Sequence, residues 1–317
     1  MIKGLGVSHA KTILLGEHSV VYGNPAIAFP IMGLTLKAKA EHAEGENWLS
    51  TPFHEGVVLP KAMAGETLEQ RLAETALRNV LKWFAADDKN IQVNVSGLIP
   101  PARGLGSSAA VAVAIIRAVA DLFGAELSDV EQFNLVQSVE KVAHGTPSGL
   151  DAHATSTRVP IWFENGQVKP LKLLTKPALL VADTGVPGHT AEAVSIVRKK
   201  RQENFQQVTK DFDKIAELTY EAGASLEDGD FENLGQLMTY NHRILQTLGV
   251  SNNKLDRLVD DSLRGGALGA KLTGGGLGGC IVVLGKNSES LPALKENLFA
   301  AGAKTVWDVF EPRSAEV

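Results

Sequence analysis

A glycine- and serine-rich turn that opens into an apolar helix is the feature of the sequence with the clearest chemistry. It reads Pro100-Pro101-Ala102-Arg103-Gly104-Leu105-Gly106-Ser107-Ser108. Glycines let a backbone approach a ligand closely, and the free amides and dipole at a helix N-terminus favour an anion. Serine hydroxyls can add a bond to phosphate or to Mg²⁺. The turn therefore predicts a phosphate site, and the alternative is an ordinary helix start with Ser107 or Ser108 as N-cap.

Other known catalytic and phosphate-binding motifs fit the chain poorly. Gly104-x-Gly106-x-x-Ala109 matches the dinucleotide fingerprint, but that fingerprint follows a strand directly. Here residues 96–103, which include two prolines, intervene. The sequence contains no Gly-x-x-x-x-Gly-Lys-Ser/Thr loop, no His-Glu-x-x-His and no Gly-x-Ser-x-Gly.

A second glycine-rich segment follows Lys271-Leu272-Thr273 and spans Gly274 to Gly279, in which only Leu277 is not glycine. Such a run costs substantial backbone entropy, so it favours a loop that wraps a ligand and presents successive amides to it. The alternative is a tight connection beside a packed helix. Cys280, at the start of the strand that follows, is interpreted as a small core residue.

Two further segments place charged side chains at turns. Lys11 lies at the start of an apolar strand. A Gly-Glu-His turn, which contains Glu17 and His18, ends this strand. Glu140 lies near the end of a helical pattern, and Asp151 follows after a helix-breaking turn. Two carboxylates that flank a turn can divide the work, one on a metal and one on a proton. Standing alone, either segment is better explained by surface and structural roles.

The elements that must position these residues change character along the chain. Residues 34–40 and 91–95 alternate as half-buried strands, 68–84 reads as an amphipathic helix, and the helix from Ser108 to Phe123 is apolar all round, as expected of a central helix. A capping box at Ser128 and Glu131 starts a helix to about Val142. Beyond about residue 175 come a strand at 178–182, helical patterns at 189–208, 211–227, 230–247 and 252–264, a strand at 281–284, a helix to about 300 and a last strand at 304–310.

Length, composition and charge restrict the class of protein. The 317 residues, 44% hydrophobic and 21% charged, are typical of a globular protein of two domains. A net charge of −5 argues against nucleic acid as a partner. The single cysteine excludes an intrachain disulfide and favours a reducing, cytoplasmic compartment. The apolar run from Ala109 to Ile116 is too short to span a bilayer, so no membrane partner is expected.

Taken together, these segments resemble the superfamily of galacto-, homoserine, mevalonate and phosphomevalonate kinases. Three signature segments match in order: Lys11 to Gly23, Pro101 to Ala110, and Lys271 to Cys280. Within the superfamily, the run from Gly16 to Gly23 and the run from Glu140 to Asp151 are most similar to mevalonate kinases of the kind found in Gram-positive bacteria. One departure is Ala10, where relatives often have glycine before the lysine.

The resemblance implies an α+β fold of two domains. The N-terminal kinase domain, 1–178, would be similar to domain 2 of ribosomal protein S5 and contain a left-handed βαβ unit. The C-terminal domain, 179–317, would be ferredoxin-like and carry the second glycine loop. ATP would lie between the two domains.

The resemblance also implies a role for individual residues. Asp151 would be the catalytic base, with Lys11 beside it, and Glu17 and His18 would lie near the substrate with them. Ser108 and Glu140 would hold Mg²⁺. ATP would be bound by Pro101, Ala102, Arg103, Gly104, Leu105, Gly106, Ser107 and Ser108, and by Gly274, Gly275 and Gly276.

The implied activity is ATP-dependent phosphorylation of (R)-mevalonate to 5-phosphomevalonate in the mevalonate pathway of isoprenoid biosynthesis, with ATP and Mg²⁺ as cofactors. Family habit favours a homodimer. Two alternatives stay open. A phosphomevalonate kinase should need extra cations for the phosphate of its substrate, and a non-catalytic sensor of ATP and an alcohol should have lost the base or the metal ligand. Lys11, Glu140 and Asp151 are all present.

Overall fold

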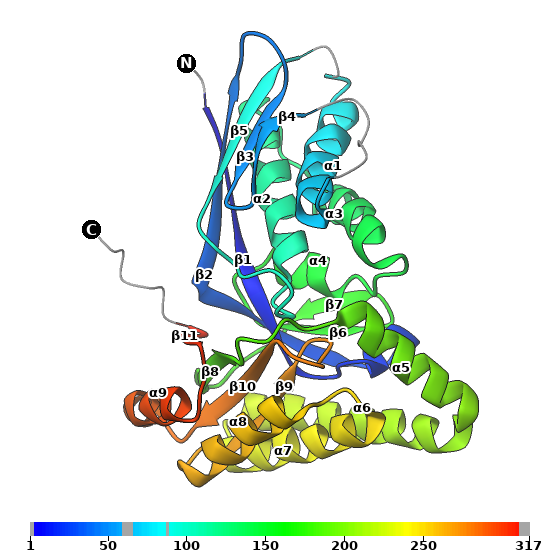
Figure 1. Ribbon diagram of the computed structural model, residues 1–317, viewed down its shortest axis with the longest axis vertical. Coiled ribbons are helices and arrows are strands. Elements are labelled where there is room, and N and C mark those ends of the chain that lie inside the picture. Colours follow the sequence, from blue (N-terminus) through cyan, green and yellow to red (C-terminus); the bar gives the residue numbers. More distant parts are fainter. Residues whose placement is uncertain (1–2, 59–65, 87–88, 311–317) are drawn as a thin grey trace. The chain divides into compact units, whose positions relative to one another are not determined.

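The computed structural model describes residues 3–58, 66–86 and 89–310, which pack into two compact units (Figure 1). The first unit holds the described residues of Met1–Ala10, Leu34–Ile99 and Gly106–Thr157, and the second holds those of Lys11–Gly33, Pro100–Leu105 and Arg158–Val317. Two long strands, β1 (Lys3–Leu15) and β2 (Ala26–His42), contribute residues to both units. This division differs from a single break after residue 178, and the predicted domain boundary stays a prediction.

The first unit combines a mixed sheet with a layer of helices. Its further elements are β3 (Trp48–Thr51), β4 (His54–Val57), α1 (Leu68–Trp83), β5 (Ile91–Ser96), α2 (Ser107–Leu122), α3 (Asp129–His144) and α4 (Leu150–Ala154). β5 pairs antiparallel with β2 and parallel with β3, and β4 pairs antiparallel with β3. Helices α1, α2 and α3 contact one another on one side of these strands (Figure 1). Most side chains of α2 are buried, as its all-round apolar sequence predicts.

Strand β1 and helix α2 approach each other closely because two strand positions are glycine. A Cβ at Gly4 would come within 2.0 Å of a backbone oxygen of α2, and a Cβ at Gly6 would come within 2.1 Å of another. Arg117 of α2 then donates a hydrogen bond of 2.7 Å to the carbonyl of Val7 on β1. The helix thereby binds a backbone group of the strand, as a covered sheet edge requires.

The second unit contains a separate antiparallel sheet. Its elements are η1 (Ser19–Tyr22), β6 (Ile161–Glu164), β7 (Gln167–Pro170), β8 (Ala178–Asp183), α5 (Thr190–Glu203), α6 (Phe205–Asp228), α7 (Phe231–Leu248), α8 (Asn253–Arg264), β9 (Gly269–Thr273), β10 (Cys280–Gly285), η2 (Ser288–Ser290), α9 (Leu291–Ala300) and β11 (Thr305–Asp308). The sheet has the order β11-β8-β10-β9. With helices between β8 and β9 and between β10 and β11, this is the β-α-β-β-α-β arrangement of ferredoxin-like domains.

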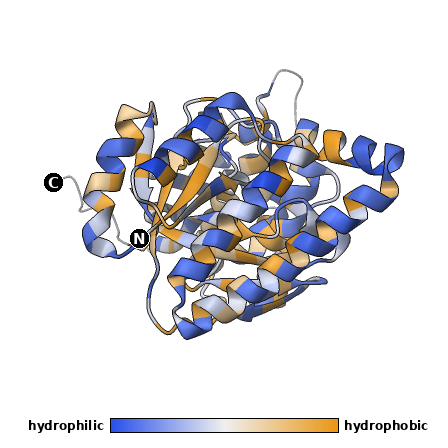
Figure 2. Cartoon of the chain, turned by 90° about the horizontal axis from the view of Figure 1, so that it is seen from below, coloured by the Kyte–Doolittle hydropathy of each residue, from blue (hydrophilic) through white to orange (hydrophobic). Residues whose placement is uncertain are grey.

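Helix α7 covers the outer edge of β9. Gly235 of α7 and Gly269 of β9 lie so close that a Cβ on either would come within 2.3 Å of backbone atoms. Two helical turns further along α7, Nδ1 of His242 accepts a hydrogen bond of 3.3 Å from the backbone N–H of Leu272. Figure 2 shows the matching pattern of hydropathy: the helices alternate between hydrophilic and hydrophobic positions, whereas several strands are hydrophobic along their length.

The structure confirms the two-domain α+β class and most of the predicted elements. Ser128 and Glu131 form the predicted capping box at the start of α3. The sequence predicted one helix at 189–208 and the next at 211–227. In the structure the break between the two helices lies at Asn204, whose φ of −141° is not helical. The apolar residues Val208 and Phe212 are buried on one continuous helix, α6, which is why the break comes earlier than predicted. Among the described residues, no helix is long and apolar enough to cross a membrane.

Candidate active site

Ser108 and Glu140 meet in the first unit although 32 residues separate them. The hydroxyl of Ser108, in the first turn of α2, donates a hydrogen bond of 2.6 Å to Oε1 of Glu140 on α3. Glu140 is only 1% exposed. His144 lies on the next turn of α3, with its Nε2 3.7 Å from Oε2 of Glu140. Two oxygen ligands of a kind that suits Mg²⁺ therefore lie side by side.

The alternative interpretations of this pair are wrong. Helix α2 begins after Gly106, which has a φ of 69° and makes no side-chain cap, so neither Ser107 nor Ser108 is the N-cap. Glu140 is buried and is not the solvated helix end that its position near Gly145 suggested. The serine hydroxyl is instead available to Glu140 because the glycine takes the left-handed conformation at the helix start.

Asp151 lies in the first turn of the short helix α4, after Gly149, whose φ is 94°. The helix is fixed to its surroundings from its C-terminal side. Nη2 of Arg117 donates a hydrogen bond of 2.7 Å to the carbonyl of Ser156, and the hydroxyl of Thr155 donates one of 2.8 Å to the carbonyl of Asp151. Asp151 is half-buried as a residue.

The Gly-Glu-His turn lies in the second unit and is buried. Glu17 forms an ion pair with Lys271 of β9, and its Oε2 accepts a hydrogen bond of 3.3 Å from Asn241 of α7. Nε2 of His18 lies 2.9 Å from the carbonyl of Gly275, to which it donates a hydrogen bond. The turn is therefore attached to the second glycine loop through His18, and to β9 and α7 through Glu17.

Burial dominates the electrostatics of this turn. It raises the pKa of Glu17 and lowers the pKa of Lys271, while the attraction between the two charges opposes both shifts. Burial also lowers the pKa of His18 to about 4, so the imidazole is neutral at pH 7. Burial likewise raises the pKa of Cys280 well above its usual range, and this thiol is a core residue, as predicted.

The first part of the predicted phosphate turn, Pro100–Leu105, also belongs to the second unit. Nε of Arg103 lies 2.9 Å from Oδ1 and 3.0 Å from Oδ2 of Asp183, at the end of β8. The carbonyl of Ala102 accepts a hydrogen bond of 2.7 Å from the N–H of Gly188. The carbonyl of Leu105 accepts one of 3.0 Å from the N–H of Lys11.

The glycines of the second loop have a reason within the protein itself. A Cβ at Gly276 would come 2.0 Å from the carbonyl oxygen of Val250, and one at Gly279 would come 2.8 Å from that of Arg103. Gly275 would meet Thr190 at 2.8 Å. Close packing of backbone on backbone therefore accounts for these glycines, which was the alternative interpretation. Presentation of amides to ATP stays a prediction.

The predicted residues fall into two sets. Ser108, Glu140 and Asp151 belong to the first unit, whereas Lys11, Glu17 and His18 belong to the second with the glycine loop. The pairing of Lys11 with Asp151 stays a prediction. Sequence reasoning gave no role to Asp183, Asn241 or Lys271, although Lys271 heads a signature segment.

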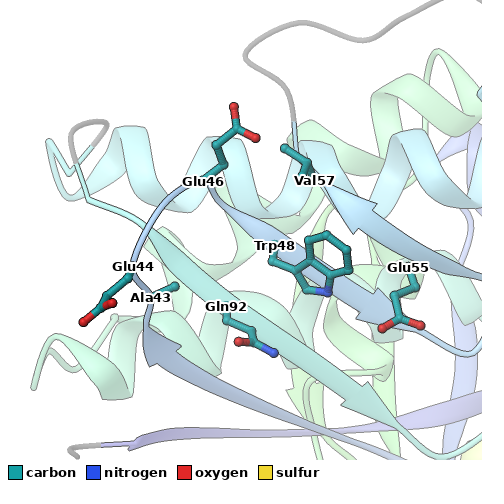
Figure 3. Close-up of a pocket in the computed structure, with 7 residues that line it drawn as sticks. All are labelled: Ala43, Glu44, Glu46, Trp48, Glu55, Val57 and Gln92. Atoms are coloured by element: carbon teal, nitrogen blue, oxygen red, sulfur yellow. The ribbon is translucent and has the colours of Figure 1, made fainter.

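A surface depression in the first unit does not contain any predicted residue. It is lined by three exposed glutamates together with Trp48 and three other residues: Ala43, Glu44, Glu46, Trp48, Glu55, Val57 and Gln92 (Figure 3). Three carboxylates repel an anion such as a phosphate. The depression is therefore not a candidate for the phosphate site.

Comparison with known proteins fits this geometry. The N-terminal domain of GHMP kinases matches residues 71–158, and the C-terminal domain matches residues 213–304. The chain belongs to the GHMP kinases.

Within that family the similarity is to mevalonate kinases. The mevalonate kinase of Thermococcus gammatolerans is 37% identical over 90% of this chain and 90% of the relative. The crystal structure of L. major mevalonate kinase in complex with R-mevalonate has a TM-score of 0.81 at 30% identity, covering 96% of this chain and 94% of that one. The Methanococcus jannaschii mevalonate kinase structure has a TM-score of 0.83 at 28% identity, covering 96% of both chains.

These comparisons confirm the resemblance to mevalonate kinases and the kinase fold. They do not confirm the Gram-positive type, because the curated relatives at 31–37% identity are archaeal.

Proposed function

We propose that this kinase transfers the γ-phosphate of ATP to the primary hydroxyl of (R)-mevalonate, forming 5-phosphomevalonate. The observation that carries the proposal is its identity of 31–37% with mevalonate kinases over about nine-tenths of the chain. Lys11, Glu17, His18, Glu140 and Asp151 are present as that activity requires. By the same likeness we infer a cytoplasmic homodimer, which size-exclusion chromatography with light scattering would test.

The oxygens of Ser108 and Glu140 support a role in holding Mg²⁺. Mg²⁺ is usually bound by one or two protein oxygens, and substrate phosphates and water complete its shell. The two side chains are held 2.6 Å apart, and Glu140 is buried. The described residues hold no cluster of three or more His, Cys, Asp or Glu side chains that could bind the ion without phosphate and water. When bound, Mg²⁺ would neutralise charge on the phosphates.

Asp151 and Lys11 are assigned complementary tasks. Phosphoryl transfer depends on positioning and charge stabilisation more than on covalent catalysis. Asp151, on a helix fixed by Arg117, would orient the substrate hydroxyl and accept its proton. Lys11 would stabilise the developing alkoxide with its positive charge.

The turn from Pro101 to Ser108 is assigned to the phosphates. Its carbonyls at Ala102 and Leu105 accept hydrogen bonds from Gly188 and Lys11. These bonds fix the peptide planes of the turn, so the amides would be oriented before ATP arrives. Preorganised donors of this kind stabilise charge without a reorganisation cost.

One assay decides the substrate. ADP release should be measured with purified protein and four acceptors: mevalonate, phosphomevalonate, galactose and homoserine. We expect mevalonate to exceed the other three by at least ~10³-fold in kcat/KM, because a wrong acceptor leaves buried polar groups unpaired. Faster turnover of phosphomevalonate would assign the chain as a phosphomevalonate kinase. No turnover with any acceptor would favour the sensor.

A further inference from the structure

Lys271 and Glu17 form an ion pair in the second unit that is closed to solvent, with side chains 0% and 1% exposed. Nζ of Lys271 donates to Oε1 of Glu17 and, at 2.7 Å, to the carbonyl of Leu272. Oε2 of Glu17 accepts a hydrogen bond from Nδ2 of Asn241. Both carboxylate oxygens of Glu17 are therefore bound by protein groups.

Stability alone does not account for such a pair. The cost of desolvating two charges offsets much of their attraction, so well-packed apolar residues in the same place are often as stabilising or more so. A buried pair can instead fix one geometry among several, which is its best-attested use. Here the pair joins residues 254 positions apart in the sequence.

The segments on either side of the pair are joined by further bonds. The hydroxyl of Thr273, two residues after Lys271, accepts a hydrogen bond of 2.9 Å from the N–H of Ile13 and donates one of 3.0 Å to the carbonyl of that residue. His18 donates to the carbonyl of Gly275. His18 also has a φ of 62°, a conformation that residues other than glycine rarely adopt, so the turn depends on such contacts to hold it.

We propose that Lys271 is a positioning residue: together with Asn241 it fixes the carboxylate of Glu17, and so sets the Gly16–His18 turn and the start of the glycine loop in their working conformation. The inference rests on the proposed function, which assigns Glu17 and His18 to the substrate site. It refines that assignment, because Glu17 acts by fixing the turn and has no carboxylate oxygen left without a protein partner.

Three variants separate positioning from a purely structural role. Lys271→Met leaves a buried carboxylate without its cation and should lower Tm by roughly 5–8 °C. The double variant Glu17→Gln/Lys271→Met removes both charges and should regain most of that loss. Lys295→Met is the matched control in the same unit: its partner is Asp308 and the side chains are 32% and 22% exposed, so Tm should change by about 2 °C or less.

Activity and hydrogen exchange are then measured below Tm. The double variant should keep a kcat/KM for mevalonate roughly 10²-fold below wild type, because a small misplacement near the chemistry has that effect. Most of the loss should fall on kcat. Amides of residues 16–19 and 274–279 should exchange at least ~10-fold faster than in wild type and in Lys295→Met.

Recovery of Tm together with wild-type kcat/KM in the double variant would overturn the proposal, since the pair would then be structural only. If wild type does not phosphorylate mevalonate, the proposed function fails by itself. The exchange measurement still decides the positioning role in that case: unchanged exchange in both segments overturns it, and faster exchange confined to them supports it.

Discussion

Replacing Arg103 by methionine should loosen the turn proposed to bind phosphate from the sheet of the second unit. The side chains of Arg103 and Asp183 are 12% and 4% exposed, and Nε of Arg103 lies within 3.0 Å of both carboxylate oxygens. Breaking one side of a buried pair costs about 3–5 kcal/mol. Asp183 would keep its hydrogen bond of 2.8 Å from the N–H of Gly185, and Arg103 is partly solvated, so we expect a loss below that range, about 2–3 kcal/mol.

This loss should appear in both stability and ATP binding. In a protein of this size about 2–3 kcal/mol corresponds to a fall in Tm of roughly 3–5 °C. If about half of the interaction acts on the conformation that binds ATP, KM for ATP should rise ~10-fold. Methionine keeps much of the length of the side chain, so the change removes charge and hydrogen bonds more than packing volume.

Thermal unfolding and steady-state kinetics with Arg103→Met, Asp183→Asn and the double variant would test this reasoning. The double variant should be more stable than the sum of the single changes predicts, because the two groups interact directly. Lys295→Met serves as the exposed control, with an expected change below about 1 kcal/mol. A loss in Arg103→Met no larger than in this control, with KM for ATP unchanged, would refute the role of the ion pair.

Three other predictions concern the proposed catalytic and metal-binding residues and the buried histidines. Asp151→Asn should lower kcat by roughly 10²–10⁴ with ATP binding retained, and near-normal turnover at neutral pH would exclude it as the base. Ser108→Ala and Glu140→Gln should each shift the Mg²⁺ titration of activity to higher metal; an unchanged titration would mean that other groups bind the ion. Burial lowers the pKa of His18 and of His242 to about 4, so both stay neutral in the folded protein while the unfolded chain binds protons below about pH 6.5. The contribution of these histidines to the free energy of unfolding should therefore be complete above pH 6.5 and fall toward pH 4 by up to roughly 3 kcal/mol for each histidine. Urea unfolding measures this free energy. A flat profile from pH 7 to 4.5 would contradict the prediction.

Local sequence signals were sufficient for most elements of the fold. The all-round apolar run that became α2, the capping box of α3 and the alternation in β5 each depend on neighbours within a few residues. The helix-breaking turn before Asp151 is local in the same sense. The break at Asn204 was misplaced because two adjacent helical patterns both accept the residues between them.

For the candidate site, too, some features could be predicted from the sequence and others depend on the tertiary structure. The sequence alone indicated which segments could carry chemistry, since a glycine turn before a helix and a carboxylate after a turn can be read in order along the chain. Only the tertiary structure decided which groups meet: Ser108 with Glu140, Arg103 with Asp183, and Glu17 with Lys271, separated by 32, 80 and 254 positions. Pairs so distant in sequence are selected by how strands and helices pack, and that packing also explains the glycines of the second loop, which neighbouring backbone requires. The periodicity of apolar residues shows that one face of an element is buried. It does not identify the element against which that face packs.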